Sequence, residues 1–135
     1  MEKNLNTYLK TLISILIILA FMIKSSPVSS GFPTMITGAA SWYAEFSPGI
    51  KLTTANMETF DHDKLTCAIW DMPFNTVLLV TNNENGKTVK VRVNDRGPAK
   101  KLCREGRVID LTKGAFEKLA DLDKGLIDVK VEVLK

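Results

Sequence analysis

Two aspartates stand where a short chain could place groups for acid–base chemistry. Asp95 lies in the segment VNDRGP (93–98), directly after an alternating valine stretch, and Asp110 lies in VIDL among apolar neighbours. A carboxyl group in apolar surroundings is costly unless it is paired or functional. Partial burial or a nearby carboxylate raises the pKa of such an acid, which suits it to protonate and deprotonate a substrate. Both residues are therefore candidate general acids.

The residues after Asp95 could fix the direction of its carboxylate. Arg96 is able to hold Asp95 or a neighbouring acid by a two-pronged hydrogen bond, and Gly97-Pro98 turns the chain sharply away. Simpler interpretations stay open at this stage. Asp95 and Arg96 would equally form a structural ion pair, and Asp110 would equally be a carboxylate that favours the N-terminus of a following helix.

Alternating valines predict the strands that must position these acids. Segments 76–82 and 87–94 are predicted to form a β-hairpin, in whose turn Asn85 and Gly86 take positive backbone angles. Segment 128–134 alternates in the same way, and the small and aromatic segment 37–44 is typical of a strand close to another backbone. A helix over 113–122, capped by Thr112, is also predicted.

The connections complete the expected architecture. Segment 45–65 is polar and interrupted by Pro48 and Gly49, which predicts a long surface loop of the kind that tends to carry function. Several short strands, one or two short helices and long connections favour a mainly β fold closed into a small barrel. Among the aromatic residues, Tyr43 is expected to face a groove and Trp42 to face the interior.

Residues 1–30 are typical of a secretory signal peptide. An apolar run at 11–23 follows a polar start, and small residues follow it, which predicts cleavage near Ser30. An uncleaved anchor is the alternative, although the run is shorter than the roughly 18 residues of a membrane span. Residues 31–135 suffice for one domain. The protein is therefore expected to be exported, periplasmic or cell-wall associated, without membrane contact once the leader is removed.

Charge and cysteine content narrow the function classes. Three of the 18 basic and one of the 15 acidic residues lie in 1–30, so residues 31–135 carry a net charge of +1. This near-neutral charge gives no electrostatic case for binding nucleic acid. Neither a cofactor nor a metal is expected, since His62, Cys67 and Cys103 show no ligand spacing. In an oxidising compartment the two cysteines are predicted to form a disulfide, although two free thiols remain the alternative.

The chain resembles the rare lipoprotein A family in a series of motifs that follow the family's order. These motifs are GAASWY (38–43), TTANMETF (53–60), LTCAIWDMPFNT (65–76), VKVRVNDRGP (89–98), GRVIDLTKGAF (106–116) and VKVEVL (129–134). The resemblance implies a six-stranded double-psi β barrel. It implies an enzyme that cleaves peptidoglycan glycan strands between N-acetylmuramic acid and N-acetylglucosamine without water, leaving a 1,6-anhydro end.

The resemblance also assigns the site. It places the functional acids at Glu58 and Asp95 and adds Asp110, which matches the essential acid of expansins and barrel-type transglycosylases. Asn56, beside Glu58, joins Tyr43 and Arg96 as an expected substrate-binding residue. The three acids are expected to converge at one mouth of the barrel.

Two departures from the family pattern keep a second function open. Met57 replaces the family's glycine beside Glu58, and Ile69 stands where its functional histidine would be. These changes favour a non-catalytic module of expansin type that binds or loosens cell-wall glycans. Retention of the three acids favours the lytic transglycosylase. The sequence leaves protein partners open.

Overall fold

The computed structural model describes residues 4–10, 13, 31 and 33–134. The chain divides into two compact units, residues 1–30 and 31–135. Residues 4–10 of the first unit are helical. Within the described part of the chain, no helix combines the length and apolar character that a membrane crossing needs. The predicted apolar run at 11–23, apart from Ile13, and the predicted cleavage site near Ser30 lie outside the described residues.

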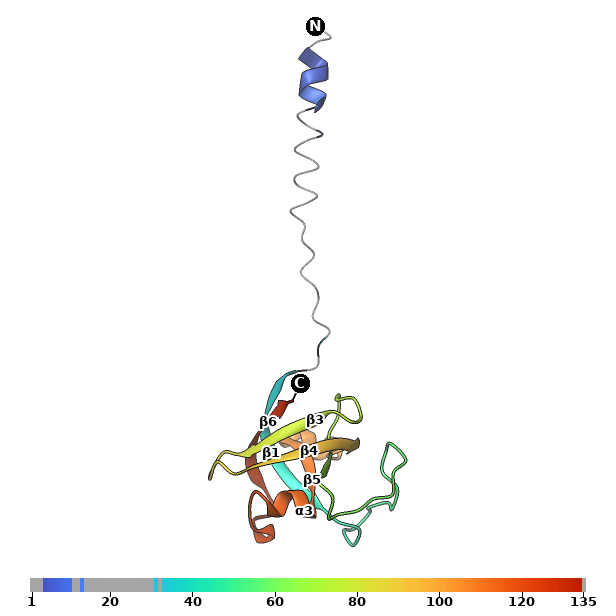
Figure 1. The fold of residues 1–135 in the computed structure, drawn as a ribbon, viewed down its shortest axis with the longest axis vertical. Coiled ribbons are helices and arrows are strands. Elements are labelled where there is room, and N and C mark those ends of the chain that lie inside the picture. Colours follow the sequence, from blue (N-terminus) through green and yellow to red (C-terminus); the bar gives the residue numbers. More distant parts are fainter. Residues whose placement is uncertain (1–3, 11–12, 14–30, 32, 135) are drawn as a thin grey trace. The chain divides into compact units, whose positions relative to one another are not determined.

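The second unit is a closed barrel (Figure 1). Its strands are β1 (Met35–Tyr43), β2 (Thr66–Ala68), β3 (Val77–Asn82), β4 (Thr88–Asp95), β5 (Arg107–Thr112) and β6 (Ile127–Val133). They are neighbours in the order β1-β5-β2-β4-β3-β6, and β6 pairs with β1 to close the ring. The pairs β1–β5 and β2–β4 are parallel, and the other pairs are antiparallel. The predicted mainly β barrel is confirmed, and closure gives each of these six strands a neighbour on both sides.

Alternating side chains fill the barrel. Val89, Val91 and Val93 of β4 are 7%, 1% and 0% exposed, as their alternation with charged residues predicts. Val129 and Val131 of β6 are equally buried, at 0% and 1%. Burying one such side chain stabilises the fold by about 1.5–3 kcal/mol. The apolar interior therefore holds the strands whose ends carry the polar site.

Short helices join the strands: α2 (Lys100–Arg104), α3 (Lys113–Glu117) and the 3-10 helix η1 (Leu122–Lys124). The predicted helix over 113–122 begins where expected but ends at Glu117, because the chain must turn there to seat Leu119 in the core. Thr112 occupies the N-cap position of α3, as predicted, but its side chain makes no capping hydrogen bond. The Thr112 hydroxyl donates instead to the carbonyl of Lys64 at 2.5 Å, which fastens the end of the long loop to β5.

The β3–β4 hairpin forms as predicted, with one difference in its turn. Gly86 takes a positive φ of 75°, but Asn85 does not. The Asn85 side chain is occupied in another way: its Nδ2 donates to the carbonyl of Leu119 at 2.9 Å, and its Oδ1 accepts from the Lys87 N–H at 2.9 Å. The asparagine thus ties the turn to the chain after α3.

The two cysteines are free thiols, so the prediction of a Cys67–Cys103 disulfide is wrong for this structure. Cys67 belongs to β2, is 0% exposed and points into the barrel core. Cys103 lies on α2, and its thiol donates to the carbonyl of Pro98 at 3.4 Å. Burial raises the pKa of the Cys67 thiol, which keeps it protonated inside the apolar interior.

Candidate active site

Asp95 and Asp110 lie on either side of the same β2 residue. Ala68 is in register with Asp95 of β4 and with Asp110 of β5. Side chains at paired positions of neighbouring strands point to the same face of a sheet. Neighbouring strands are about 4.8 Å apart, so the two aspartates stand about 10 Å apart at their Cα atoms. The expected convergence of these two acids therefore follows from the strand register.

Asp110 is the more enclosed of the two acids. Its side chain is 20% exposed, Ser41 Oγ donates to its Oδ1 at 2.5 Å, and Arg107 Nη1 lies 3.8 Å from the same oxygen. Burial raises the pKa of Asp110, and the negative charge of Asp95 adds to this, while the Ser41 hydrogen bond and Arg107 oppose it. Asp110 is thus a carboxyl group with a proton affinity above that of a solvated aspartate. It does not stand at a helix end, because it lies within β5.

Gly97 makes room beside Asp110. A methyl group placed on Gly97 would lie 3.2 Å from the Cβ of Ala68 and 3.4 Å from Oδ2 of Asp110. The first contact is tight and the second is at the edge of ordinary van der Waals distance, so a side chain here would require its neighbours to shift slightly. Gly97 therefore allows the chain that follows β4 to lie close to the Asp110 carboxylate.

Asp95 is fixed by backbone groups. Its Oδ1 accepts from the N–H groups of Ala55 and Arg96, each at 2.9 Å. The N–H of Asn56 donates to the carbonyl of Asn94 at 3.2 Å. Together these contacts hold the long loop 44–65 against the end of β4, although the two are 40 residues apart in sequence.

Arg96 does not grip an acid, and this part of the sequence prediction is wrong. Its guanidinium lies 3.8 Å from the ring centre of Phe74 and donates to the carbonyl of Ile69 at 3.1 Å. The guanidinium is therefore held by a cation–π contact with the Phe74 ring and a hydrogen bond to the Ile69 carbonyl. Arg96 contacts Asp95 through its backbone N–H, which donates to Oδ1 at 2.9 Å, and through Nη1, which donates to the backbone carbonyl at 3.5 Å. Neither contact joins the guanidinium to the carboxylate, so the ion-pair alternative also fails.

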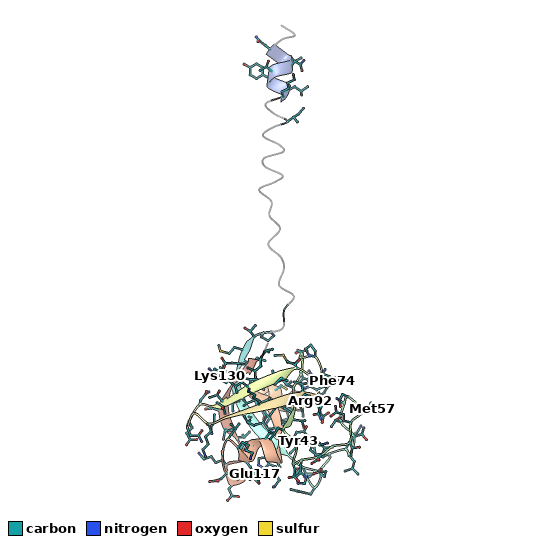
Figure 2. All side chains as sticks on the ribbon, viewed as in Figure 1. Tyr43, Met57, Phe74, Arg92, Glu117 and Lys130 are labelled. Atoms are coloured by element: carbon teal, nitrogen blue, oxygen red, sulfur yellow. The ribbon has the colours of Figure 1, made fainter. Side chains whose placement is uncertain are left out.

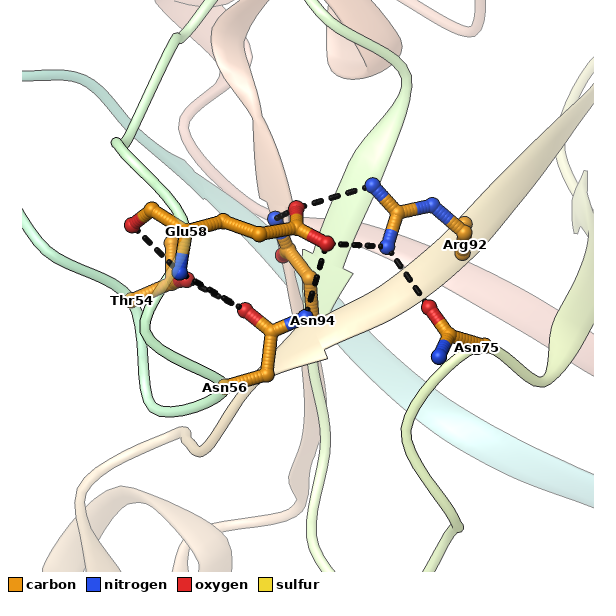
Figure 3. A network of polar contacts seen from close by, with 6 residues as sticks. All are labelled: Thr54, Asn56, Glu58, Asn75, Arg92 and Asn94. Carbon is orange, nitrogen blue, oxygen red and sulfur yellow. Dashed lines mark hydrogen bonds and ion pairs between the residues drawn. The ribbon is translucent and has the colours of Figure 1, made fainter.

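Glu58 is held by a fork of hydrogen bonds (Figure 3). Arg92 Nη1 and Nη2 donate to its two carboxylate oxygens at 2.8 and 2.9 Å. Asn94 and Asn56 donate to the same carboxylate at 3.1 and 2.8 Å. The hydrogen bonds from Arg92, then those from Asn94 and Asn56, lower the pKa of Glu58 to about 2. Glu58 is therefore a fixed negative charge at neutral pH.

Tyr43 stands behind the acids rather than in an open groove. It is 7% exposed, and its ring stacks on Phe60 with centroids 4.8 Å apart. Burial above all, and then the charges of Asp95 and Asp110, raise the pKa of Tyr43 well above its usual value. Its ring face is therefore closed to a sugar, while its hydroxyl stays protonated near the two carboxylates. Trp42 packs against the barrel core, as predicted.

An open groove of about 570 Å³ runs between the long loop and the end of β4. Its walls are Gly49, Ile50, Lys51, Thr53, Thr54, Ala55, Met57, Asp95 and Arg96. This volume lies within the range of small-ligand pockets, about 300–1,000 Å³. Asp95 lines this groove, whereas Asp110 and Glu58 are not among its lining residues. Asn56 turns toward Glu58, so it positions that acid.

Sequence reasoning missed Ser41 and Arg92 as parts of the site. Ser41 reads as a small strand residue and Arg92 as one of the wet positions of β4, and nothing in their neighbours along the chain marks them. Each finds its acid across the sheet or loop, at sequence separations of 69 and 34 residues. The strand register places Ser41 opposite Asp110, and the packing of the long loop on β4 brings Glu58 to Arg92.

The family comparison agrees with this geometry. A family model described as lytic transglycolase matches residues 35–131. The chain belongs to this family. The resemblance to rare lipoprotein A proteins is confirmed, and with it the double-psi β barrel.

Curated relatives support the same family. The chain is 39% identical over 132 residues to the endolytic peptidoglycan transglycosylase RlpA of Campylobacter jejuni, covering 82% of this chain and 46% of that protein. It is 42% identical over 96 residues to the protein of the same name from Neisseria meningitidis, covering 71% and 38%. The chain therefore spans less than half the length of these relatives.

Solved structures share the barrel. The Streptomyces papain inhibitor matches with a TM-score of 0.58 and 26% identity, covering 75% of this chain and 94% of that one. A mutant Clavibacter michiganensis expansin in complex with cellohexaose matches with a TM-score of 0.55 and 27% identity, covering 75% and 50%. The same barrel thus occurs in an inhibitor and in a glycan-binding protein.

Proposed function

We propose that this chain is an exported peptidoglycan lytic transglycosylase. It cleaves the bond between N-acetylmuramic acid and N-acetylglucosamine and leaves a 1,6-anhydro end. The observation that carries this proposal is the placement of Asp95 and Asp110 about Ala68, with the pKa of Asp110 raised and a saccharide-sized groove beside Asp95. The names of the curated relatives support the same substrate.

Asp110 is the proposed acid and then the proposed base. Its carboxyl proton passes to the glycosidic O4 as the bond from C1 to that oxygen breaks. The resulting carboxylate then accepts the proton of the C6 hydroxyl of the same muramic acid residue, whose oxygen bonds to C1. No water is consumed, and Asp110 ends protonated, ready for another turnover. Partial burial suits it to this exchange.

The other two acids act through their charge. Asp95 lines the groove and carries a carboxylate that stabilises the positive charge developing at C1, as the second acid does in glycosidases. Glu58 is unsuited to donate a proton, because Arg92 holds both of its oxygens. Its proposed role is to fix the part of the long loop between Thr53 and Thr59, which supplies wall residues of the groove.

A non-catalytic wall-binding module is the second candidate. Ile69, at the family's histidine position, is 2% exposed and packs in the core, so this position offers the substrate no titratable side chain. The expansin bound to cellohexaose shares the barrel, which supports glycan binding without specifying cleavage. Under this alternative the groove and the acids would bind glycan and leave its bonds intact.

Product analysis separates the two candidates. The protein is incubated with purified peptidoglycan and with glycan strands freed of stem peptides, and the soluble products are examined by mass spectrometry. Anhydro-ended fragments support the transglycosylase. Retained sedimentation with the wall, with no such fragments from either substrate, supports the binding module.

The proposed location rests on residues 1–30, which we assign as a cleaved leader. N-terminal sequencing of the protein recovered from a secreting host tests this directly. A mature N-terminus at Gly31 supports export with cleavage after Ser30. Recovery of the uncleaved chain in the membrane fraction would favour an anchor.

A further inference from the structure

Met57 occupies a turn position that favours glycine. Thr54 and Glu58 close a three-residue loop, since the Thr54 N–H donates to the carbonyl of Glu58 and the Met57 N–H donates to the carbonyl of Thr54, both at 2.9 Å. The last residue of such a loop takes a left-handed conformation. Met57 does so with a φ of 70°. A residue with a Cβ adopts this conformation less readily than glycine does.

The Met57 side chain does not pack in the core, so burial does not offset this strain. Met57 is 81% exposed, and it belongs to neither apolar cluster of the described residues. Figure 2 shows it at the outer edge of the barrel unit. A strained, exposed residue at a functional site is an observation from which a functional role can be inferred.

Met57 lies on the wall of the groove that Asp95 lines. Ile50 is the other large apolar side chain of this wall, and Lys51 supplies a positive charge. The groove is thus lined both by polar groups and by the flexible thioether of Met57. Methionine is unbranched and polarisable, so it adapts to small apolar groups but forms only weak hydrogen bonds.

We propose that Met57 selects N-acetylated sugars by contacting the methyl group of their acetamido substituent. The inference rests on the proposed glycan-binding function and names a specificity residue within it. A sugar with a hydroxyl group in place of the acetamido group offers Met57 no methyl to bury. Glucans such as cellulose oligosaccharides therefore cannot make this contact, whereas peptidoglycan strands carry an acetamido group on every ring.

Two soluble probes test this selectivity. The protein is titrated calorimetrically with the hexasaccharide of N-acetylglucosamine and with cellohexaose. The unaltered protein is expected to bind the acetylated probe more tightly. In Met57→Gln, which keeps the length but not the apolar character, affinity for the acetylated probe falls about three- to fivefold, the contribution expected of one buried methyl group. Affinity for cellohexaose stays unchanged.

Matched variants separate the contact from the strain. Met57→Ala and Met57→Gly both lose the contact, but only glycine relieves the left-handed strain, so the Gly variant melts at a higher temperature than the Ala variant. Leu52→Ala is the control, because Leu52 is 66% exposed on the same loop but does not line the groove. It leaves the affinity for both probes unchanged.

Several outcomes overturn the inference. These are failure of the unaltered protein to bind the acetylated probe, equal affinity for both probes, and equal losses on both probes in Met57→Gln. The test is independent of cleavage. If anhydro products form but the protein does not prefer the acetylated probe, only the role of Met57 is contradicted. If the protein prefers the acetylated probe but no anhydro products form, only the transglycosylase activity is contradicted.

Discussion

Asp95 and Asp110 share a single β2 partner, Ala68, one strand to either side. This register brings to one face the carboxylates of two residues that belong to different strands. The charge of Asp95 adds to the effect of burial in raising the pKa of Asp110. The parallel β2–β4 pair and the antiparallel β2–β5 pair are therefore what assemble the acids.

Asp110→Asn is expected to stabilise the protein at pH 7. The pKa of Asp110 in the folded chain lies above its usual value of 3.8, so the contribution of this group is favourable below that pH and is lost as pH rises through the folded pKa. An uncharged amide avoids this loss. Thermal denaturation at pH 7 and pH 3 checks it, with the advantage of the variant shrinking at pH 3. A variant less stable than the parent at pH 7 would contradict the assignment.

Glu58→Gln is expected to flatten the acid limb of the stability curve. The pKa of Glu58 is lowered from 4.5 to about 2, so its contribution is fully present above pH 4.5 and disappears as pH falls toward 2. The melting temperature of the parent should drop over that window more than that of the variant. Lys90→Gln, on an exposed position of the same strand as Arg92, is the control and should follow the parent. Parallel curves for the parent and Glu58→Gln would count against the Arg92 fork.

Ser41→Ala is expected to raise the pKa of Asp110 further. The hydroxyl of Ser41 donates to the carboxylate and favours its charged form, so its removal leaves burial less opposed. Carbon-detected NMR titration of the Asp110 carboxyl measures the shift without any substrate. Ser41→Thr keeps the hydroxyl and should restore the parent value. An unchanged titration in Ser41→Ala would show that the hydrogen bond has no influence on the acid.

Gly97→Ala is expected to destabilise the fold and to disturb Asp110. The added methyl would lie 3.2 Å from Ala68 and 3.4 Å from the Asp110 carboxylate, and overpacking of this kind typically costs about 1–3 kcal/mol. Chemical denaturation measures the loss, and the NMR titration of Asp110 reports the local change. Full stability together with an unchanged titration would mean that the strand end can move aside freely.

The sequence predicts the barrel better than it predicts the partners within the site. Alternation in 87–94 fixes which β4 side chains enter the core, and the burial of Val89, Val91 and Val93 follows from it. Helix α3 is shorter than its pattern indicates, because tertiary packing of Leu119 overrides the local preference.

The side-chain partners depend on contacts that local patterns do not encode. Arg96 follows Asp95 in sequence and is the natural partner to expect for an acid. Of the two arginines in this segment, however, it is Arg92, four residues earlier on β4, that forms the two-pronged hydrogen bond, and its partner is Glu58. Strand β4 ends at Asp95, so Arg96 lies beyond the strand, where its guanidinium meets the Phe74 ring and the Ile69 carbonyl. The expected exposure of Tyr43 fails for a similar reason, since Phe60 of the long loop covers its ring.

The most direct test of the account compares anhydro-product release by the parent, Asp110→Asn, Asp95→Asn and the control Asp128→Asn, an exposed acid on β6. Glycan strands freed of stem peptides are the substrate, and mass spectrometry quantifies the 1,6-anhydro ends. We predict that Asp110→Asn lowers the rate by about 10²- to 10⁴-fold, the usual contribution of a general acid, that Asp95→Asn also lowers it, and that Asp128→Asn matches the parent. Undiminished product from Asp110→Asn would contradict the account.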